Sequence, residues 1–564
     1  VQSREEEGTT LAAVTADGRV LLAGFQRGES LLGEEGELEQ TVSELAVTGR
    51  VTHLALDVDQ RELYLVTDDG HLHYYDVQDK EAPRLLDVVT VAPAGGQVTA
   101  LEFLAGGISV LVGDSTGRIE QWFPVRDASN NYHLAHVRGF RLGQAPITAI
   151  APEFYRKGFL AADAAGVVGI FHTTAGRTLL WRQAADGPIT LAAMLPHADG
   201  ALLVDGSESL QRWSIHNEHP EVSWRSLWGK VWYESRQQPE WIWQSSSASN
   251  DFEPKFSLTP LAFGTLKATF YAMLFAIPLG VLGALFAGYF MHPAMRKVVK
   301  PTVEVMAALP TVILGFLAGL WLAPLVEHNL PGIFLILLLT PLSLVAAGWG
   351  WDALPEGLRR RVPEGLEAAL LIPVVVLTIW LSMVLGHPLE DLLFDGNMPA
   401  WITSELGIDF DQRNSLVVGI AMGFAVIPTI FSISEDGVHS VPRHLVHGSL
   451  ALGATPWQTL WRVVLPTASP AIFSALMIGL GRAVGETMIV LMATGNTPVV
   501  DFNIFTGFRA LSANIAVEMP ETEVHSTHYR VLFLAALVLF LATFLVNTAG
   551  EIVRQRLRRR YSSL

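Results

Sequence analysis

The sequence predicts a mixed fold, in which an all-β propeller domain is followed by an all-α polytopic membrane domain. Residues 1–255 carry 35 acidic and 20 basic residues, a net charge of −15, whereas residues 256–564 carry 20 and 18, a net of −2. Short alternating apolar runs fill the first part, and nearly all the long apolar runs lie in the second. We therefore expect a propeller domain over 1–220, a juxtamembrane connector over 221–255 and a membrane domain over 256–564.

The propeller prediction rests on an internal repeat in the first part of the chain. Four alternating runs open on Val51-Thr52, Val98-Thr99, Ile147-Thr148 and Ile189-Thr190, and an aromatic residue follows 24 positions after each opening, namely Tyr75, Trp122, Phe171 and Trp213. Turn-forming Asp and Gly residues separate the runs, as in β-hairpins. The repeat length of 42 to 49 residues matches one four-stranded blade, and the pattern resembles the WD40-like propellers.

The start of the chain and the end of the propeller carry two further expectations. Asp17-Gly18 matches the turn of an earlier repeat whose opening would precede residue 1, so we expect the first blade to be truncated in this sequence. We also expect an upstream signal or signal-anchor helix, because the acidic domain needs one to leave the cytoplasm. The connector is rich in Trp and then in Ser, which is typical of a membrane–water boundary; a Trp cluster that closes the last blade is the alternative.

Seven apolar runs in the second part are long enough to span a bilayer. They cover residues 261–290, 301–323, 332–350, 366–386, 415–434, 469–494 and 529–548. Basic residues gather in alternate connections, at 291–300, 356–365, 435–466 and the C-terminal tail, and the other connections are neutral or acidic. The positive-inside rule then predicts a multi-pass protein of the cell inner membrane with a periplasmic N-terminal domain and a cytoplasmic C-terminus.

The cytoplasmic loop 435–466 is predicted to form two short amphipathic helices that meet at Gly453. The second helix has a clear start, because Thr455 and Gln458 form a T-x-x-Q capping box and Pro456 suits the first helical position. Pro466 is expected to end this helix. A short helix that lies against the membrane suits a lever that transmits force from a cytoplasmic partner.

This loop resembles the coupling loop of ABC-importer permeases. Gly453, Leu465 and Pro466 keep the family pattern at matching spacing, whereas His447-Gly448-Ser449 stand in place of its Glu-Ala-Ala start. The resemblance implies that a set of loop residues couples the chain to an ATPase. These are His447, Gly448, Ser449, Gly453, Ala454, Thr455, Pro456, Leu465 and Pro466.

Three longer stretches, 259–290, 298–316 and 479–496, are similar to phosphate-specific permease subunits of the PstC type. The similarity covers about 256–345 and 415–564, while 346–414 looks like an added membrane hairpin. The propeller resembles the large periplasmic insertion of long proteobacterial members. The resemblance implies a MetI-like permease fold and the role of transmembrane subunit in an ATP-driven inorganic phosphate importer.

The same resemblance implies three partners, which are a second permease subunit of the PstA type, a PstB-like ATPase dimer and a periplasmic, PstS-like phosphate-binding protein. No G-x-x-x-x-G-K-[ST] phosphate loop occurs in the sequence. We therefore expect a permease subunit that is not itself an enzyme and holds no cofactor, with ATP bound by the partner chain.

Arg482 and Glu486 lie in the middle of the 469–494 run, where charge is costly. At a spacing of four they are expected on one face of one helix, with Gly481 and Gly485 allowing close approach of a neighbouring helix. One interpretation is an ion pair that fixes helix packing. The other is a translocation path, in which the guanidinium binds an oxyanion and the carboxylate limits its grip. The family resemblance favours the path.

Three further residues are candidates for that path. Thr487 adjoins Glu486, and Thr311 follows Pro310 at an expected kink. Lys267 lies within the first span, where it either lines the path or extends its amine to the interface.

The composition limits the other functions. The acidic surface disfavours nucleic acid, and the absence of Cys excludes disulfides and thiolate metal sites. A net charge of −15 also makes the propeller a poor anion trap and favours protein docking. Two alternatives stay open, a permease for another oxyanion such as sulfate or molybdate, and a non-transporting membrane scaffold or sensor.

Overall fold

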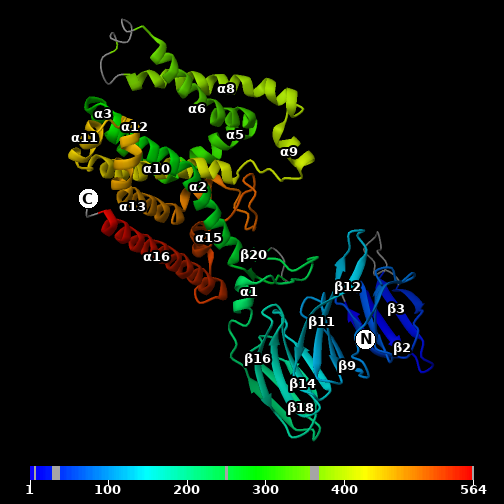
Figure 1. The fold of residues 1–564 in the computed structure, drawn as a ribbon. Coiled ribbons are helices and arrows are strands. Elements are labelled where there is room, and N and C mark those ends of the chain that lie inside the picture. The colour runs from blue at the N-terminus through cyan, green and yellow to red at the C-terminus, as the bar shows by residue number, and fades with distance from the viewer. Residues whose placement is uncertain (5–7, 28–37, 248–251, 356–361, 363–366, 562–564) are drawn as a thin grey trace. The chain divides into compact units, whose positions relative to one another are not determined.

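The structure is a computed structural model that describes residues 1–4, 8–27, 38–247, 252–355, 362 and 367–561 (Figure 1). It divides into two compact units, Val1–Ser257 and Leu258–Leu564, and each is described by itself. The boundary between the units lies two residues from the one expected at 255/256. The Trp-rich segment 221–255 belongs to the first unit.

The first unit is built from consecutive antiparallel sheets whose strands follow one another in chain order. Four sheets have four strands each. The first consists of β1 (Gln2–Arg4), β2 (Gly8–Val14), β3 (Val20–Arg27) and β4 (Leu38–Leu45), and the second of β5 (Val51–Leu56), β6 (Glu62–Thr67), β7 (His71–Asp76) and β8 (Arg84–Thr90). The third consists of β9 (Val98–Phe103), β10 (Val110–Asp114), β11 (Arg118–Arg126) and β12 (Tyr132–Arg141), and the fourth of β13 (Ile147–Pro152), β14 (Gly158–Asp163), β15 (Val167–His172) and β16 (Arg177–Gln183). The fifth sheet has three, β17 (Ile189–Met194), β18 (Gly200–Asp205) and β19 (Leu210–Ser214).

The sheets pack face to face in a blade arrangement. Their first strands are neighbours, because β5 contacts β9, β9 contacts β13, and β13 contacts β17. The buried side chains between successive sheets form separate apolar clusters, one for each pair of neighbouring sheets. The expected propeller-like, all-β domain is confirmed.

The Thr of each repeat opening has a common structural role. Thr52, Thr99, Thr148 and Thr190 each donate a side-chain hydrogen bond to the carbonyl oxygen 14 residues later, at 3.1 to 3.3 Å. In every case the Thr is the unpaired residue of an irregularity between the first two strands of its sheet. The hydroxyl thus bonds a carbonyl oxygen of the neighbouring strand at each bulge.

The turn between the second and third strands differs in the fifth sheet. Gly70, Gly117 and Gly166 adopt positive φ angles of 82°, 79° and 81°, which Gly accepts without strain. In the fifth sheet Glu208, not Gly206, occupies that position, with φ of 63°. The Asp205 side chain still accepts hydrogen bonds from Ser207 N and Ser209 N, so the turn keeps its geometry despite the substitution.

The segment after β19 folds back onto the propeller. It contains α1 (Trp224–Trp228), β20 (Trp243–Gln244) and β21 (Lys255–Phe256). Glu234 pairs with Lys157 and accepts a hydrogen bond from Ser109, and Arg138 donates to the carbonyl oxygen of Trp232. These buried polar contacts tie the segment to the third and fourth sheets.

The second unit is helical in the part that the structure describes. Its helices are α2 (Thr259–Leu285), α3 (Pro293–Ala307), α4 (Thr311–Leu317), α5 (Ala323–His328), α6 (Leu330–Ala353), α8 (Leu371–Leu393), α9 (Met398–Leu406), α10 (Ser415–His439), α11 (Arg443–Ala451), α12 (Pro456–Thr459), α13 (Leu465–Val484), α14 (Met488–Ala493), α15 (Leu511–Glu518) and α16 (Thr527–Tyr561). Short π-helical turns extend α2 and join α4 to α5 and α12 to α13. Within the described residues, seven continuous helical stretches are long and apolar enough to cross a membrane, as expected.

Two of the expected spans have different limits. The run expected over 301–323 is broken, because α3 ends at Ala307 and the spanning helix begins at Thr311 after Pro310. The basic stretch 291–300, expected as a loop, lies largely in α3. The span expected over 469–494 is also wrong, since it runs instead from Pro456 to Val484 and then stops.

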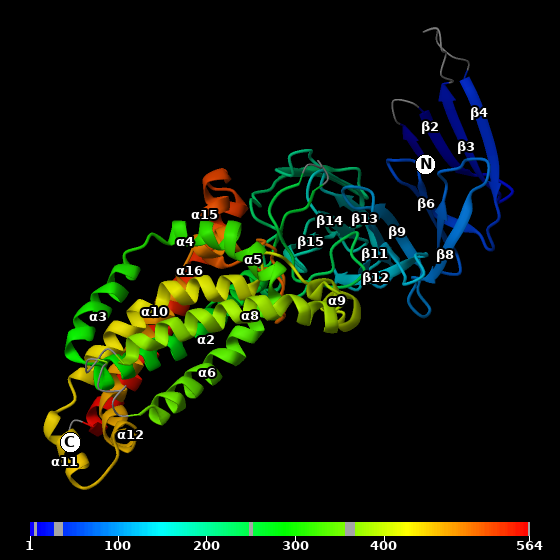
Figure 2. The same ribbon diagram turned by 90° about the horizontal axis from the view of Figure 1, so that it is seen from above.

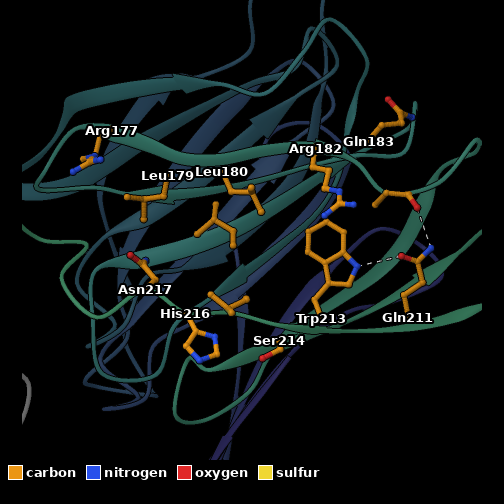
Figure 3. Close-up of a pocket in the computed structure, with 13 residues that line it drawn as sticks. Arg177, Leu179, Leu180, Arg182, Gln183, Gln211, Trp213, Ser214, His216 and Asn217 are labelled. Carbon is orange, nitrogen blue, oxygen red and sulfur yellow. Dashed lines mark hydrogen bonds between the residues drawn. The ribbon is translucent and has the colours of Figure 1, made fainter.

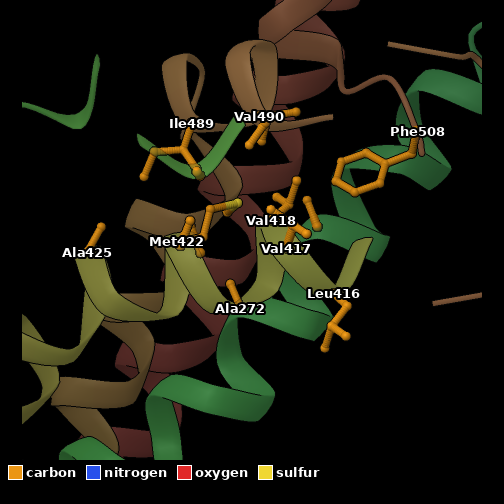
Figure 4. Close-up of a cluster of buried hydrophobic side chains, with 14 of the residues drawn as sticks. Ala272, Leu416, Val417, Val418, Met422, Ala425, Ile489, Val490 and Phe508 are labelled. Atoms are coloured by element: carbon orange, nitrogen blue, oxygen red, sulfur yellow. The ribbon is translucent and has the colours of Figure 1, made fainter. Parts of the chain in front are cut away.

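The core of this unit lies where α2 packs against α10. Ala272 of α2 meets Val418 and Met422 of α10 in a closely packed apolar cluster (Figure 4). Small residues permit this close approach, because a Cβ at Gly419 would come within 2.9 Å of Tyr271. Helices α6 and α8 pack against each other beside this core (Figure 2). Most of their side chains are exposed. The stretch 346–414, expected as an added hairpin, contains only the end of α6, together with α8 and α9.

Candidate translocation site and coupling loop

The span that carries Arg482 is broken at the residues of interest. Helix α13 ends at Val484, Gly485 and Glu486 are not helical, and α14 begins at Met488. The expectation that Arg482 and Glu486 share one helical face is therefore wrong. The Glu486 carboxylate turns toward the second helix and accepts hydrogen bonds from Met488 N at 3.2 Å and Ile489 N at 3.4 Å, which satisfies two amides at the start of α14.

The Arg482 side chain is held by a residue of α10. Its Nη1 donates to Thr429 Oγ1 of α10 at 3.1 Å, and the side chain is half-buried. Among the described residues, no carboxylate lies within ion-pairing distance of this guanidinium. The intramembrane ion pair with Glu486 is thus not formed.

Thr311 and Thr487 lie at the same level as this break. Gly315 of α4 and Gly319 of the following π-helical turn approach the backbone of Met488 and Met492 of α14, so the two segments run parallel. Thr311, one turn before Gly315, then lies at the level where α13 gives way to α14. The Thr487 hydroxyl donates to the carbonyl oxygen of Gly485 at 3.2 Å, and α14 begins one residue later, at Met488.

Lys267 lies elsewhere, and its amine is buried within the protein. Its side chain is 5% exposed, and Nζ donates to Thr506 Oγ1 at 3.0 Å. The Thr506 hydroxyl in turn lies 2.9 Å from Asp501 Oδ2. Lys267 therefore holds the loop that connects α14 to α15, and no described contact brings it to Arg482.

The coupling loop forms the expected pair of helices, α11 and α12. Gly453 separates them with φ of 87°, in open space where no atom lies within 4 Å of a Cβ position. The capping box is present, since Gln458 N donates to Thr455 Oγ1 at 3.2 Å and Thr455 N donates to Gln458 Oε1 at 3.0 Å. Ser449 and Thr459 join the two helices through their hydroxyls, 2.9 Å apart.

Pro466 does not end the second helix, contrary to expectation. Residues Leu460–Val464 form a π-helical turn, and the chain continues through Leu465 and Pro466 into α13. The missing N–H of Pro466 is tolerated because the proline lies in the first turn after the π-bulge. Helix α12 is thus continuous with the span that carries Arg482.

The tip of the loop exposes large apolar side chains. Leu452 is 91% exposed, Trp457 is 59% exposed and Trp461 is 50% exposed. His447 and Gly448 are exposed beside them, whereas Ser449 and Ala454 are half-buried. Such a patch, rimmed by polar residues, is typical of a protein-binding surface.

The sequence analysis missed a charged cluster behind this loop. Glu435, near the end of α10, is fully buried and forms ion pairs with Arg296 and Lys300 of α3. Asp436 pairs with Lys300, and His439 Nδ1 lies 2.7 Å from Arg296 Nη1. The spacing of Arg296 and Lys300 is visible in the sequence, but their partners lie about 140 residues away in another helix. Thr429 was missed for the same reason.

Comparison with known proteins bears on this arrangement. A family model described as "Binding-protein-dependent transport system inner membrane component" matches residues 365–563. Phosphate transport system permease protein PstC 1 of Mycobacterium bovis is 31% identical over 232 residues, which cover 40% of this chain and 69% of that protein. The chain belongs to the PstC family of permease subunits.

Other curated relatives agree with this assignment. PstC of Xylella fastidiosa is 29% identical over 42% of this chain and 75% of its own length. The probable ABC transporter permease protein YqgH of Bacillus subtilis is 27% identical over 52% of this chain and 71% of its own length. As a PstC-family member, the chain is a permease subunit of an ABC-type transporter and a multi-pass membrane protein. Permease subunits of this class work with an ATPase and a substrate-binding protein.

Solved structures also resemble the first unit distantly. The β-propeller domain of Cps50 (Swd1) from Myceliophteria thermophila is 14% identical with a TM-score of 0.30, over 38% of this chain and 67% of that one. Sqt1 from Chaetomium thermophilum is 18% identical with a TM-score of 0.29, over 37% and 53%.

Proposed function

We propose that the chain forms part of the translocation path of an ATP-driven inorganic phosphate importer. The observation that carries this proposal is Arg482, a half-buried guanidinium beside a broken membrane span with no carboxylate partner among the described residues. A charge in such a place is usually functional and faces a hydrated pathway. The relatives named as phosphate transport permeases support phosphate as the anion.

In this proposal the guanidinium of Arg482 binds the phosphate oxyanion while Thr429 holds the side chain in place. An Arg fork matches the oxygens of phosphate in a bidentate manner and keeps its charge at any physiological pH. Glu486 is occupied by the amides of Met488 and Ile489, so its charge neither neutralises the arginine nor blocks it. A weak, single-cation site allows the anion to leave as well as to enter.

The hydroxyls of Thr311 and Thr487 are the neutral groups assigned to the same anion, and Thr487 would release its hydrogen bond to the Gly485 carbonyl oxygen to donate there. Helix α4 begins at Thr311 with no side-chain cap, and the partial positive charge of a helix start favours an anion. Lys267 lies away from this point, and it holds the α14–α15 connection through its hydrogen bond to Thr506.

Coupling to ATP hydrolysis is assigned to the α11–α12 loop. The exposed Leu452, Trp457 and Trp461 form the surface for an ATPase subunit, which binds the ATP. Force on this surface reaches the Arg482 site because α12 continues through the π-helical turn into α13. The residues expected in coupling, including Gly453 and Thr455, set the geometry of the lever.

The complete transporter would contain a PstA-like permease, a PstB-like ATPase dimer and a PstS-like phosphate-binding protein. The distribution of basic loops supports a cytoplasmic coupling loop and C-terminus and a periplasmic propeller.

The test is phosphate uptake by the purified complex in vesicles supplied with ATP. We expect labelled phosphate to accumulate and an ATPase chain to co-purify. Excess unlabelled phosphate should compete, whereas sulfate or molybdate should not. Equal competition by sulfate or molybdate would assign another oxyanion, and a chain that purifies without any ATPase would favour a scaffold.

A further inference from the structure

In the part of the chain that the structure describes, the fifth sheet of the propeller has no fourth strand, whereas its neighbours have one. The four preceding sheets each pair their third strand with a fourth, whereas β19 has a partner on one side only, β18, among the described residues. The side chains of β19 alternate between exposed and half-buried positions. One long edge of this strand is open.

The direction of the free backbone groups follows from the pairing with β18. Asp205 N donates to Ser209 O at 3.1 Å, and Ile215 N donates to Asp199 O at 2.8 Å. Because antiparallel residues alternate between bonded and non-bonded pairs, Gln211 and Trp213 point their amides and carbonyls toward β18. Leu210, Arg212 and Ser214 therefore direct theirs to the open edge, where they are free to bind another strand.

A groove lies along this edge (Figure 3). It has a volume of about 680 Å³ and is lined by β16 on one side and by β19 and the residues that follow it on the other. A fourth strand would lie in this groove against β16, by analogy with the second and third sheets, whose fourth strands β8 and β12 contact each other. That contact includes a carboxylate, since Leu134 N of β12 donates to Asp87 Oδ2 of β8 at 2.7 Å.

The charge of the groove is opposite to that of its domain. Arg177, Arg182 and His216 line it, and no Asp or Glu is among its lining residues, although residues 1–255 carry a net charge of −15. Arg177 donates to the carbonyl oxygen of Val222, and Arg182 has no ion-pair partner among the described residues. In Figure 3 the Arg182 side chain points toward Trp213 across the groove.

We propose that the open edge of β19 binds an extended, acidic segment of a partner protein, which adds as the antiparallel fourth strand of this sheet. Backbone hydrogen bonds to Leu210, Arg212 and Ser214 supply the affinity, and carboxylates facing Arg177 and Arg182 supply the preference for an acidic sequence. The surface serves partner docking and does not depend on the phosphate path.

The test uses the full chain in detergent and two labelled peptides, one of alternating Val and Glu and one of alternating Val and Lys. Fluorescence anisotropy should give at least tenfold tighter binding of the acidic peptide, and the difference should shrink with added salt. Amide exchange should show the outward amides of Arg212 and Ser214 exchanging fast in the free chain and slowly with the acidic peptide bound.

Two variants separate backbone pairing from charge. Arg212→Pro removes one outward amide without touching the pairing with β18, so the acidic peptide should bind at least tenfold more weakly, whereas Arg212→Ala, which keeps the amide, should bind within a few fold of the parent. Arg182→Glu should reverse the peptide preference. Equal binding by Arg212→Pro and Arg212→Ala would overturn the proposal, and so would outward amides that are already protected in the free chain, which would mean that the chain itself covers the edge.

Discussion

Lys300 of α3 and Glu435 of α10 form an ion pair, with 3.0 Å between Nζ and Oε2, at the point where α10 leads into the coupling loop. Arg296 approaches the other carboxylate oxygen of Glu435, so one fully buried anion holds two cations of a neighbouring helix. The contact fixes the position of the coupling loop relative to α3.

Removal of this anion should destabilise the membrane unit. Glu435→Gln leaves two cations without a buried partner, and breaking such a cluster costs about 3–5 kcal/mol. We expect a clear fall in the melting temperature of the purified chain in detergent. Asp436→Asn is the matched control, because that carboxylate is 65% exposed and its loss should have little effect. Equal effects of the two variants would contradict the role of Glu435.

Gly453 should resist any side chain for reasons of backbone conformation alone. Its φ of 87° strains an L-residue, and no neighbouring atom would clash with a Cβ. Gly453→Ala should therefore reduce phosphate uptake per ATP hydrolysed, while Gly453→Asn, which tolerates this conformation better, should reduce it less. Measured coupling ratios that do not distinguish Ala from Asn would argue against a conformational role.

A glycine in the turn between β18 and β19 should raise the stability of the propeller. Glu208 occupies a left-handed position that Gly18, Gly70, Gly117 and Gly166 fill in the four preceding sheets. Glu208→Gly should stabilise the propeller by about 1 kcal/mol, measured by urea unfolding of the full chain. Glu208→Ala keeps the strain and removes the carboxylate, so it should give no such gain. A gain from Ala equal to that from Gly would mean that charge, not backbone strain, is the cause.

The contact between Glu253 and the propeller should weaken as pH rises. Burial raises the pKa of this carboxyl to about 7, and Thr174 donates a hydrogen bond to it. Between its ordinary pKa of 4.5 and 7 the folded state holds a proton that the unfolded state releases, so stability falls as pH rises through this window and then levels off. Amide exchange of residues 252–257, corrected for intrinsic rates, should follow this course.

Glu253→Gln is neutral at all pH values and should abolish this dependence. Glu218→Gln, at an exposed site, is the control and should leave it unchanged. The same pH dependence in the Glu253→Gln chain would assign the effect to another group.

The sequence was most informative where local chemistry determines the structure. The 24-residue interval from Val51 to Tyr75 and its repeats located the sheets, and Thr455 with Gln458 located the start of α12. The family pattern around Gly453 located the coupling loop. Each of these depends on residues that lie close together in the chain.

The predictions from the sequence were wrong where contacts between distant segments determine the structure. A helix over 469–494 satisfies hydropathy, yet the chain breaks at Gly485 because Glu486 bonds the amides of α14. Thr429, the partner of Arg482, is one Thr in an apolar span and lies 53 positions away. The pairing of Glu435 with Arg296 likewise requires the packing of α10 on α3, which no local pattern encodes.

If Arg482 binds the transported anion, its replacement should stop transport without preventing assembly. Arg482→Gln and Arg482→Lys are to be assayed for phosphate uptake in the reconstituted complex, with assembly checked by co-purification of the ATPase. We expect an assembled complex in which Gln abolishes uptake and Lys, which keeps the charge but not the fork, retains a small part of it. Uptake by Arg482→Gln at the parental rate would show that Arg482 does not bind the anion, and a complex that fails to assemble would assign Arg482 to helix packing through Thr429.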